Sequence, residues 1–165
     1  RTIIAGIGLN VDPFTSDTEI VDLTTETQTF TLELSAASFG GADSRVLFDM
    51  GAAEGTVVID NVSLVTGGDG GFDGGLLVNG GFANGTEGWS GNAANVQTDE
   101  NGNNFNFANV ETAGDAFNVN LSQGLELAQG TNYILTFNAS SDRARTMIAG
   151  RSEELRECKG YRYRC

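Results

Sequence analysis

The sequence predicts an all-β protein, a jelly-roll β-sandwich of two antiparallel sheets. Threonine and phenylalanine are frequent and, like valine and isoleucine, favour strands, while the frequent glycine, asparagine and aspartate residues separate the strands into short stretches. Apolar and polar residues alternate within these stretches, and no long segment before residue 151 has a helical period. A chain of 165 residues is long enough for one such domain with a sizeable core.

Each strand is expected where this alternation has a period of two residues. In the fourth expected strand, Val46 and Phe48 face one way. Arg45, Leu47 and Asp49 face the other way. In chain order, the expected strands are Thr2–Asn10, Glu19–Leu23, Thr27–Leu34, Ser44–Met50, Thr56–Val65, Asn104–Val110, Ala116–Gln123, Thr131–Ala139 and Arg143–Ala149.

Charge and histidine content exclude several functions. The sequence has nine Lys and Arg against 22 Asp and Glu, a formal net charge of -13. Because phosphates and anionic lipids would be repelled, we expect no nucleic-acid partner and no membrane partner. The sequence holds no histidine, which rules out Ser-His-Asp and Cys-His nucleophiles and histidine-based zinc sites. No apolar run approaches the roughly 20 residues that span a bilayer.

A glycine-rich segment divides the chain near its middle. Gly67–Gly75 reads GGDGGFDGG, and because such a stretch loses much backbone freedom on ordering, we expect it to be a flexible linker. Its aspartates lack the spacing and the closing glutamate of an EF-hand calcium loop. The linker therefore separates residues 1–66 from residues 76–150.

The composition changes again at residue 151. The last residues, RSEELRECKGYRYRC, hold five of the nine basic residues and both cysteines, Cys158 and Cys165. We interpret residues 151–165 as unrelated to the domain, an extension that arose by cloning or by a frame shift. The alternative is a short segment that forms a disulfide or an oligomer contact.

A short repeat suggests that the two halves stand in permuted order. Arg145–Gly150 reads RTMIAG and Arg1–Gly6 reads RTIIAG, with five of six positions identical. Residues 76–150 would then be the first half of a module, and residues 1–66 the second half. In the order 76–150 followed by 7–66, the chain supplies one complete module.

In that order, the sequence resembles carbohydrate-binding modules of the family 4/9 type, as found on polysaccharide-degrading enzymes of marine bacteria. Leu76–Trp89 is similar to the family's opening "NGGFE…GW", and Gly114–Asp142 to its central strand, turn and strand. Ser44–Val65 is similar to the closing "F-D-x-G…V-x-I-D-N-V-S-L". One departure is Ala83, where the family often has a glutamate used for calcium.

The resemblance implies a jelly roll that binds a glycan and catalyses nothing. Because the termini of such sandwiches lie close together, a glycine-rich joint can connect the old end to the new start. The chain would then be a closed circular permutant, or its halves would pair with those of other chains in a swapped dimer or open filament. Arg1–Gly6 and Arg145–Gly150 would compete for one strand position.

Asp60 is the candidate metal ligand. In Thr56–Val65 it alternates in register with Val58, Val62 and Leu64, the face that we assign to the core. A buried carboxylate needs a partner, and because arginine is scarce, a hard cation with oxygen ligands suits it. The alternative is that Asp60 caps a turn or lies at the solvated edge of the sandwich.

The resemblance implies that this cation is a structural Ca²⁺ held by Asp60. Backbone oxygens of Asn79 and Gly81 are further expected ligands. A carboxylate from the loop Asp99–Asn103, for which we take Glu100, completes the expected set.

Polar side chains on an outward strand face are the candidate glycan-binding residues. Asn118 and Asn120 alternate with Phe117 in Ala116–Gln123, and Arg45 and Asp49 share an outward face. Amide, carboxylate and guanidinium groups suit sugar hydroxyls, which both donate and accept hydrogen bonds. The two asparagines equally fit ordinary solvated positions.

Aromatic side chains complete the candidate glycan site. The resemblance implies that Phe117 is a platform for a sugar ring and that the loop from Asn10 to Phe14 contributes. For Trp89, the one tryptophan, we expect core packing, because a lone large aromatic side chain is usually buried.

We therefore expect a secreted, extracellular, non-catalytic module that targets a parent enzyme to a polysaccharide. A β-glucan of the laminarin kind is the first choice of ligand, and xylan or another algal glycan comes next. The chain is too rich in carboxylates for any one pair to indicate a glycosidase. The alternative is a calcium-stabilised structural or adhesion repeat that self-assembles by strand exchange into a homo-oligomer.

Overall fold

The computed structural model describes residues 1–67 and 75–143, which form nine strands and one 3₁₀ turn. The elements are β1 (Thr2–Leu9), β2 (Ser16–Asp22), β3 (Gln28–Ser35), β4 (Gly41–Asp49), β5 (Gly55–Thr66), β6 (Val96–Thr98), β7 (Asn104–Val110), η1 (Ala116–Asn118), β8 (Asn120–Leu127) and β9 (Asn132–Ser141). Within these residues, no helix is long and apolar enough to cross a membrane.

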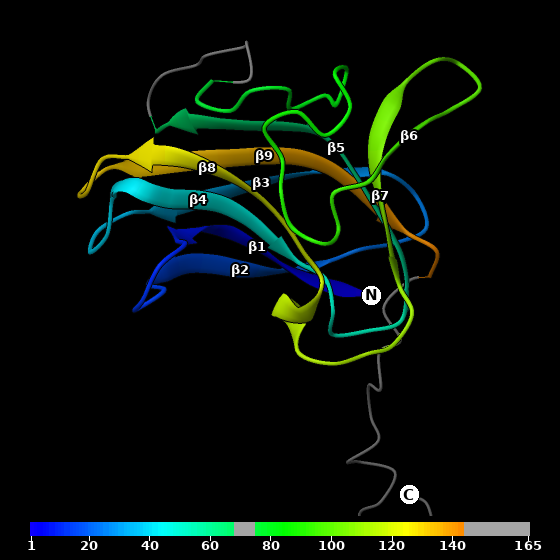
Figure 1. The fold of residues 1–165 in the computed structure, drawn as a ribbon, viewed down its shortest axis with the longest axis horizontal. Coiled ribbons are helices and arrows are strands. Elements are labelled where there is room, and N and C mark those ends of the chain that lie inside the picture. The colour runs from blue at the N-terminus through cyan, green and yellow to red at the C-terminus, as the bar shows by residue number, and fades with distance from the viewer. Residues whose placement is uncertain (68–74, 144–165) are drawn as a thin grey trace, which may run out of the picture.

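The strands form two antiparallel sheets, which confirms the all-β sandwich (Figure 1). The four-stranded sheet has the order β2-β1-β4-β8, and the five-stranded sheet has the order β3-β9-β5-β7-β6. The chain changes sheet at each connection from β2 to β5 and again from β7 to β9, as in a jelly roll. Strands from before and after the glycine-rich segment lie side by side in both sheets, so both halves of the chain contribute strands to each sheet.

The core lies between the sheets and is built on the alternation that the sequence predicts. Val46 and Phe48 of β4 are fully buried, and Phe48 packs edge-on against Phe137 of β9 with ring centroids 4.9 Å apart. Trp89 is 7% exposed and lies 5.2 Å from the ring of Phe82. The expected core role of Trp89 is therefore confirmed.

The strand predictions agree with the structure at most positions, with three differences. The expected strand Ala116–Gln123 begins as the 3₁₀ turn η1 and becomes a strand only at Asn120. The short edge strand β6 carries too few residues to show an alternation, and the sequence did not predict it. The expected strand Arg143–Ala149 lies outside the described residues except for Arg143, which is in a bend.

The predicted core face of β5 is wrong in its first half. Val57 and Ile59 are fully buried, whereas Val58 is half-buried on the opposite face together with Asp60. The pairing of β5 with β9 is shifted between Asp60 and Ser63, and Asn61 in this bulge has a φ of 50°. Because the bulge adds one residue, the period of two is interrupted and the core face changes parity.

Residues 76–95, which we call the closing segment, cover one open side of the sandwich between β8 and β5 (green in Figure 1). The side chain of Gln123 on β8 holds Val78 through both its backbone N–H and its carbonyl, at 2.8 and 2.9 Å. On the other side, the backbone N–H of Val62 on β5 donates to the carbonyl of Gly80 at 2.9 Å. Leu77, Phe82 and Trp89 of this segment are buried in the core.

Candidate functional site

A groove of about 750 Å³ crosses the outer face of the four-stranded sheet. All four strands of that sheet, the loop before β2 and the turn η1 contribute to its walls. Its floor is apolar in the middle, and polar side chains and two aromatic rings surround this floor. The lining residues are Ile4, Leu9, Phe14, Ser16, Thr18, Arg45, Leu47, Asp49, Phe117 and Asn120.

The polar side chains of the groove are held in place by their strands. Asp49 of β4 and Asn120 of β8 are directly opposite each other in the ladder, and the Asn120 amide donates to the Asp49 carboxylate at 2.5 Å. Arg45 lies on the same outward face of β4, and its buried Nε has no hydrogen-bond partner among the described residues. A buried donor without a partner is uncommon, so a ligand that accepts a hydrogen bond would satisfy it.

The two aromatic rings of the groove are strongly exposed. Phe117 in η1 is 67% exposed and Phe14 in the loop between β1 and β2 is 57% exposed. Phe14 has a φ of 55°, a left-handed conformation that a bulky residue rarely adopts without a constraint from its surroundings. Exposed rings beside hydrogen-bonding groups fit a ligand with both apolar and polar faces.

Five of the seven residues predicted for glycan binding line this groove: Phe14, Arg45, Asp49, Phe117 and Asn120. The other two do not line it. Asn118 is exposed in η1, and its carbonyl accepts from the Asn92 amide at 2.7 Å. Asn10 is exposed, and its backbone N–H donates to the carbonyl of Asp43 at 2.8 Å.

Sequence reasoning missed the floor and walls of the groove. Ile4 and Leu47 form part of the floor, and only the outward register of Leu47 was visible in the alternation. Ser16 and Thr18 of β2 lie opposite Gly8 and Gly6 of β1 in the ladder. A Cβ at Gly6 would collide with the backbone of β2, so glycine lets β2 approach closely enough to form the wall.

Asp60, the first of the residues predicted to hold calcium, is held by hydrogen bonds. Asp60 is 8% exposed, and its carboxylate accepts two hydrogen bonds: from the backbone N–H of Asn61 at 2.7 Å and from the Asn103 amide at 3.0 Å. Glu100 is exposed. Within residues 1–67 and 75–143, no group of three or more carboxylate or cysteine side chains is placed to bind a metal.

Asn79, another of the predicted calcium ligands, has a structural role in the closing segment. The Asn79 amide donates to the carbonyls of Gly85 and Glu87 at 2.9 Å each, and its side-chain oxygen accepts from the N–H of Asn84. Its carbonyl accepts from the Trp89 indole at 3.0 Å. Asn79 thus organises the closing segment. Calcium binding at Asp60 stays a prediction.

Comparisons of the chain with protein-family models, with curated proteins and with solved structures gave no match. The function is therefore inferred from the residues of this chain.

Proposed function

We propose that the groove on the four-stranded sheet binds a polysaccharide. The observation that carries this proposal is the combination of two exposed rings, Phe14 and Phe117, with the hydrogen-bonding groups of Arg45, Asp49 and Asn120 around one groove. A sugar ring has an apolar C–H face that stacks on an aromatic ring, and hydroxyls that pair with amide, carboxylate and guanidinium groups. Both kinds of contact are available here at once.

The proposed binding is non-catalytic. Glycoside hydrolysis uses a pair of carboxyl groups separated by roughly 5 to 9.5 Å across the scissile bond. Among the described residues that line the groove, Asp49 is the one carboxylate, and the Asn120 amide is bonded to it. A groove of this composition favours holding a sugar chain in place over cleaving it.

The charge of the chain favours an uncharged glycan. The groove holds one cationic and one anionic side chain, Arg45 and Asp49, and the whole chain carries a net charge of -13. An anionic polysaccharide such as alginate would be repelled over the Debye length. A β-glucan of the laminarin kind is therefore the proposed ligand, with xylan or another neutral algal glycan next. A secreted module that carries a parent enzyme to this polysaccharide is the proposed context.

Affinity electrophoresis in native gels that contain laminarin, xylan, mixed-linkage glucan or alginate tests this proposal. We expect retardation in laminarin and none in alginate. Replacing the exposed ring with Phe117→Ala should weaken binding about tenfold, if a sugar ring stacks on Phe117 with a free energy similar to the roughly 1 to 3 kcal/mol of a base on an aromatic ring. Ile20→Ala is the matched control, since Ile20 is 73% exposed on β2 and does not line the groove.

Equal mobility in every gel would contradict the proposal. The alternative function, a structural or adhesion repeat that self-assembles, would then be favoured. Retardation that survives both Phe117→Ala and Phe14→Ala would show that a glycan binds outside the groove, and this result would also contradict the proposed site.

A further inference from the structure

The first residues of the chain fill a position with narrow requirements in the middle of the four-stranded sheet. We call this position the β1 slot, the place of residues Arg1–Gly6 between β2 and β4. The Arg1 side chain donates to the carbonyls of Met50 and Glu54 at 2.7 Å each. Ile3 and Ala5 point into the core and are 2% and 0% exposed. The slot therefore selects an arginine, a large apolar residue and an alanine at fixed spacing.

A second segment of the same chain meets these requirements. Arg145–Gly150 repeats Arg1–Gly6 with one difference, Met147 in the place of Ile3. Exchanging one apolar side chain for another of similar volume is well tolerated in a core. Ala149 has the small side chain that the fully buried place of Ala5 requires, and Gly150 has the missing Cβ that the place of Gly6 requires.

The repeat ends at the last residue that fits the slot, because the residue after it would not fit. After Gly150 comes Arg151, which corresponds to Ile7, and Ile7 is fully buried. An arginine there would bury a charge without a partner, which is very unfavourable. The match is thus confined to the six residues that fit, while Ile7 and the rest of β1 have no second copy.

The second copy also begins close enough to the β1 slot to reach it. The backbone N–H of Leu23 donates to the carbonyl of Arg1 at 2.7 Å, and the carbonyl of the next residue, Thr24, accepts from the N–H of Ser141 at 2.8 Å. The end of β9 and the start of β1 therefore meet at neighbouring residues. Three residues lie between Ser141 and Arg145, and the four residue-to-residue steps from Ser141 to Arg145 span up to about 14 Å when extended.

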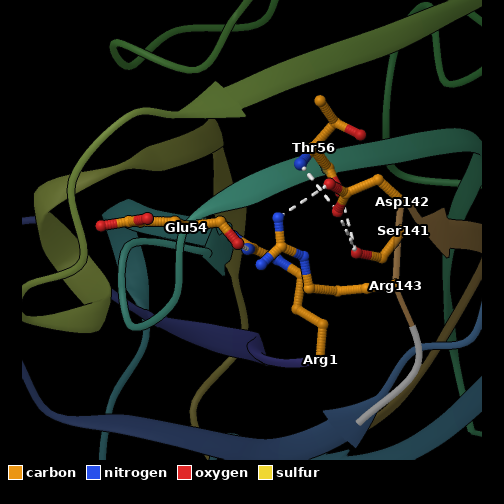
Figure 2. A network of polar contacts seen from close by, with 6 residues as sticks. All are labelled: Arg1, Glu54, Thr56, Ser141, Asp142 and Arg143. Atoms are coloured by element: carbon orange, nitrogen blue, oxygen red, sulfur yellow. Dashed lines mark hydrogen bonds and ion pairs between the residues drawn. The ribbon is translucent and has the colours of Figure 1, made fainter. Parts of the chain in front are cut away.

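Figure 2 shows how close the end of β9 lies to the start of β1. Arg1 lies beside Asp142 and Arg143, and the Asp142 carboxylate accepts from the N–H of Thr56 at 3.1 Å and from Arg143 at 3.2 Å. Burial lowers the pKa of the Arg1 guanidinium, and the charge of Asp142 opposes this shift. Asp142 would have the same effect on a second arginine brought to the position of Arg1.

We propose that Arg145–Gly150 is a second occupant of the β1 slot within the same chain. The slot is filled either by Arg1–Gly6 or by Arg145–Gly150, and the released segment leaves the sheet next to Ile7. In the second form Ile148 takes the place of Ile4, which lines the groove, so the groove keeps its floor. This inference does not depend on glycan binding, because it rests on the strand and its copy alone.

Four variants of the full chain test the exchange by thermal unfolding. Ala5→Glu makes Arg1–Gly6 unfit for the slot, and we expect it to keep a cooperative transition with Tm lowered by less than about 10 °C. Ala149→Glu alone should leave Tm unchanged within about 2 °C. The double variant should lose the cooperative transition. Ala139→Glu in β9 is the matched control, because Ala139 is 0% exposed and has no second copy, and it too should lose the transition.

A disulfide identifies the segment that occupies the slot. Ile4 is directly opposite Ile20 in the ladder. In a background of Ala5→Glu, Cys158→Ser and Cys165→Ser, the pair Ile148→Cys and Ile20→Cys should form a disulfide within one chain, because opposite residues lie at disulfide distance.

Three results would overturn the proposal. The first is an Ala5→Glu variant that unfolds like Ala139→Glu, which would show that the copy does not replace the strand. The second is a folded Ala5→Glu variant without the disulfide between positions 148 and 20. The third is a disulfide found only between two chains, which would show that the second occupant comes from another copy.

Discussion

The groove and the closing segment are both lined with polar side chains, yet these side chains are used differently. Around the closing segment, asparagine amides form hydrogen bonds with backbone groups. The side chain of Asn79 bonds to Gly85 and Glu87. The side chain of Asn106 bonds to Ala93 and Asn95. In the groove, the buried Nε of Arg45 has no partner within the described part of the chain, and the Asn120 side chain bonds to the side chain of Asp49.

This difference separates structural from binding residues of the same chemical type. An amide with its donors and its acceptor engaged by backbone groups has nothing left for a ligand and fixes a loop instead. A polar group that faces a groove with unused donors can satisfy them only with water or a ligand. Hydrogen-bond saturation, and not residue type, therefore identifies the candidate site in this asparagine-rich chain.

The largest expected effect is on stability, at Asn106 of β7. Its side chain is fully buried, donates to the carbonyl of Ala93 at 2.9 Å and accepts from the N–H of Asn95 at 2.9 Å. Asn106→Ala leaves both backbone groups without partners, and we expect a loss of about 2 to 4 kcal/mol in the free energy of unfolding, measured by urea denaturation. Asn109→Ala, at an exposed position of the same strand, should change it by less than about 0.5 kcal/mol.

Equal effects of Asn106→Ala and Asn109→Ala would show that the backbone of the closing segment finds other partners. The proposed structural role of the saturated amides would then be wrong.

The second effect is on binding, and it compares two neighbouring asparagines. Asn120→Ala removes an amide that lines the groove and holds Asp49, and we expect about tenfold weaker laminarin binding by isothermal calorimetry. Asn118→Ala should leave the affinity unchanged within about twofold, since Asn118 does not line the groove. A loss of affinity in Asn118→Ala as large as in Asn120→Ala would contradict the location of the site.

The smallest effect concerns the pairing of Asp60. Asn103→Ala removes the amide that donates to the Asp60 carboxylate at 3.0 Å but leaves the hydrogen bond from the N–H of Asn61. We expect a loss of about 1 kcal/mol in the free energy of unfolding. Because each oxygen of the carboxylate already accepts a hydrogen bond, removing Ca²⁺ with EGTA should lower Tm by less than about 2 °C.

Asp60→Asn separates the two explanations for Asp60. A larger loss of Tm in EGTA that disappears in Asp60→Asn would establish calcium at this position, as the sequence resemblance implies. An EGTA effect that persists in Asp60→Asn would show that calcium binds elsewhere in the chain.

Local alternation was enough to predict most strands and most of the outward residues of the groove. In β4, Val46 and Phe48 are buried while Arg45 and Asp49 face the groove, as their period of two predicts. Burial of Trp89 also followed from its type alone. These features depend on residues a few positions apart, and a strand places such residues on opposite faces whatever its neighbours are.

Tertiary structure decided the features that interrupt this alternation. The bulge at Asn61 moved Asp60 to the outer face of β5, and the register shift there is a property of its pairing with β9. The turn η1 brought Phe117 and Asn120 to the same groove and left Asn118 outside it, although a continuous strand would have grouped Asn118 with Asn120. Saturation of Asn79 likewise depends on where the closing segment folds.

The composition, the strand periods and the repeated six residues were thus readable from the sequence itself, because each is a local pattern. Strands and loops far away along the chain decide on which face of the sheet a residue lies after a bulge. They also decide which polar groups keep unused hydrogen-bond donors or acceptors. Those partners are chosen by packing and hydrogen-bond satisfaction over the whole sandwich, and only the folded structure contains them.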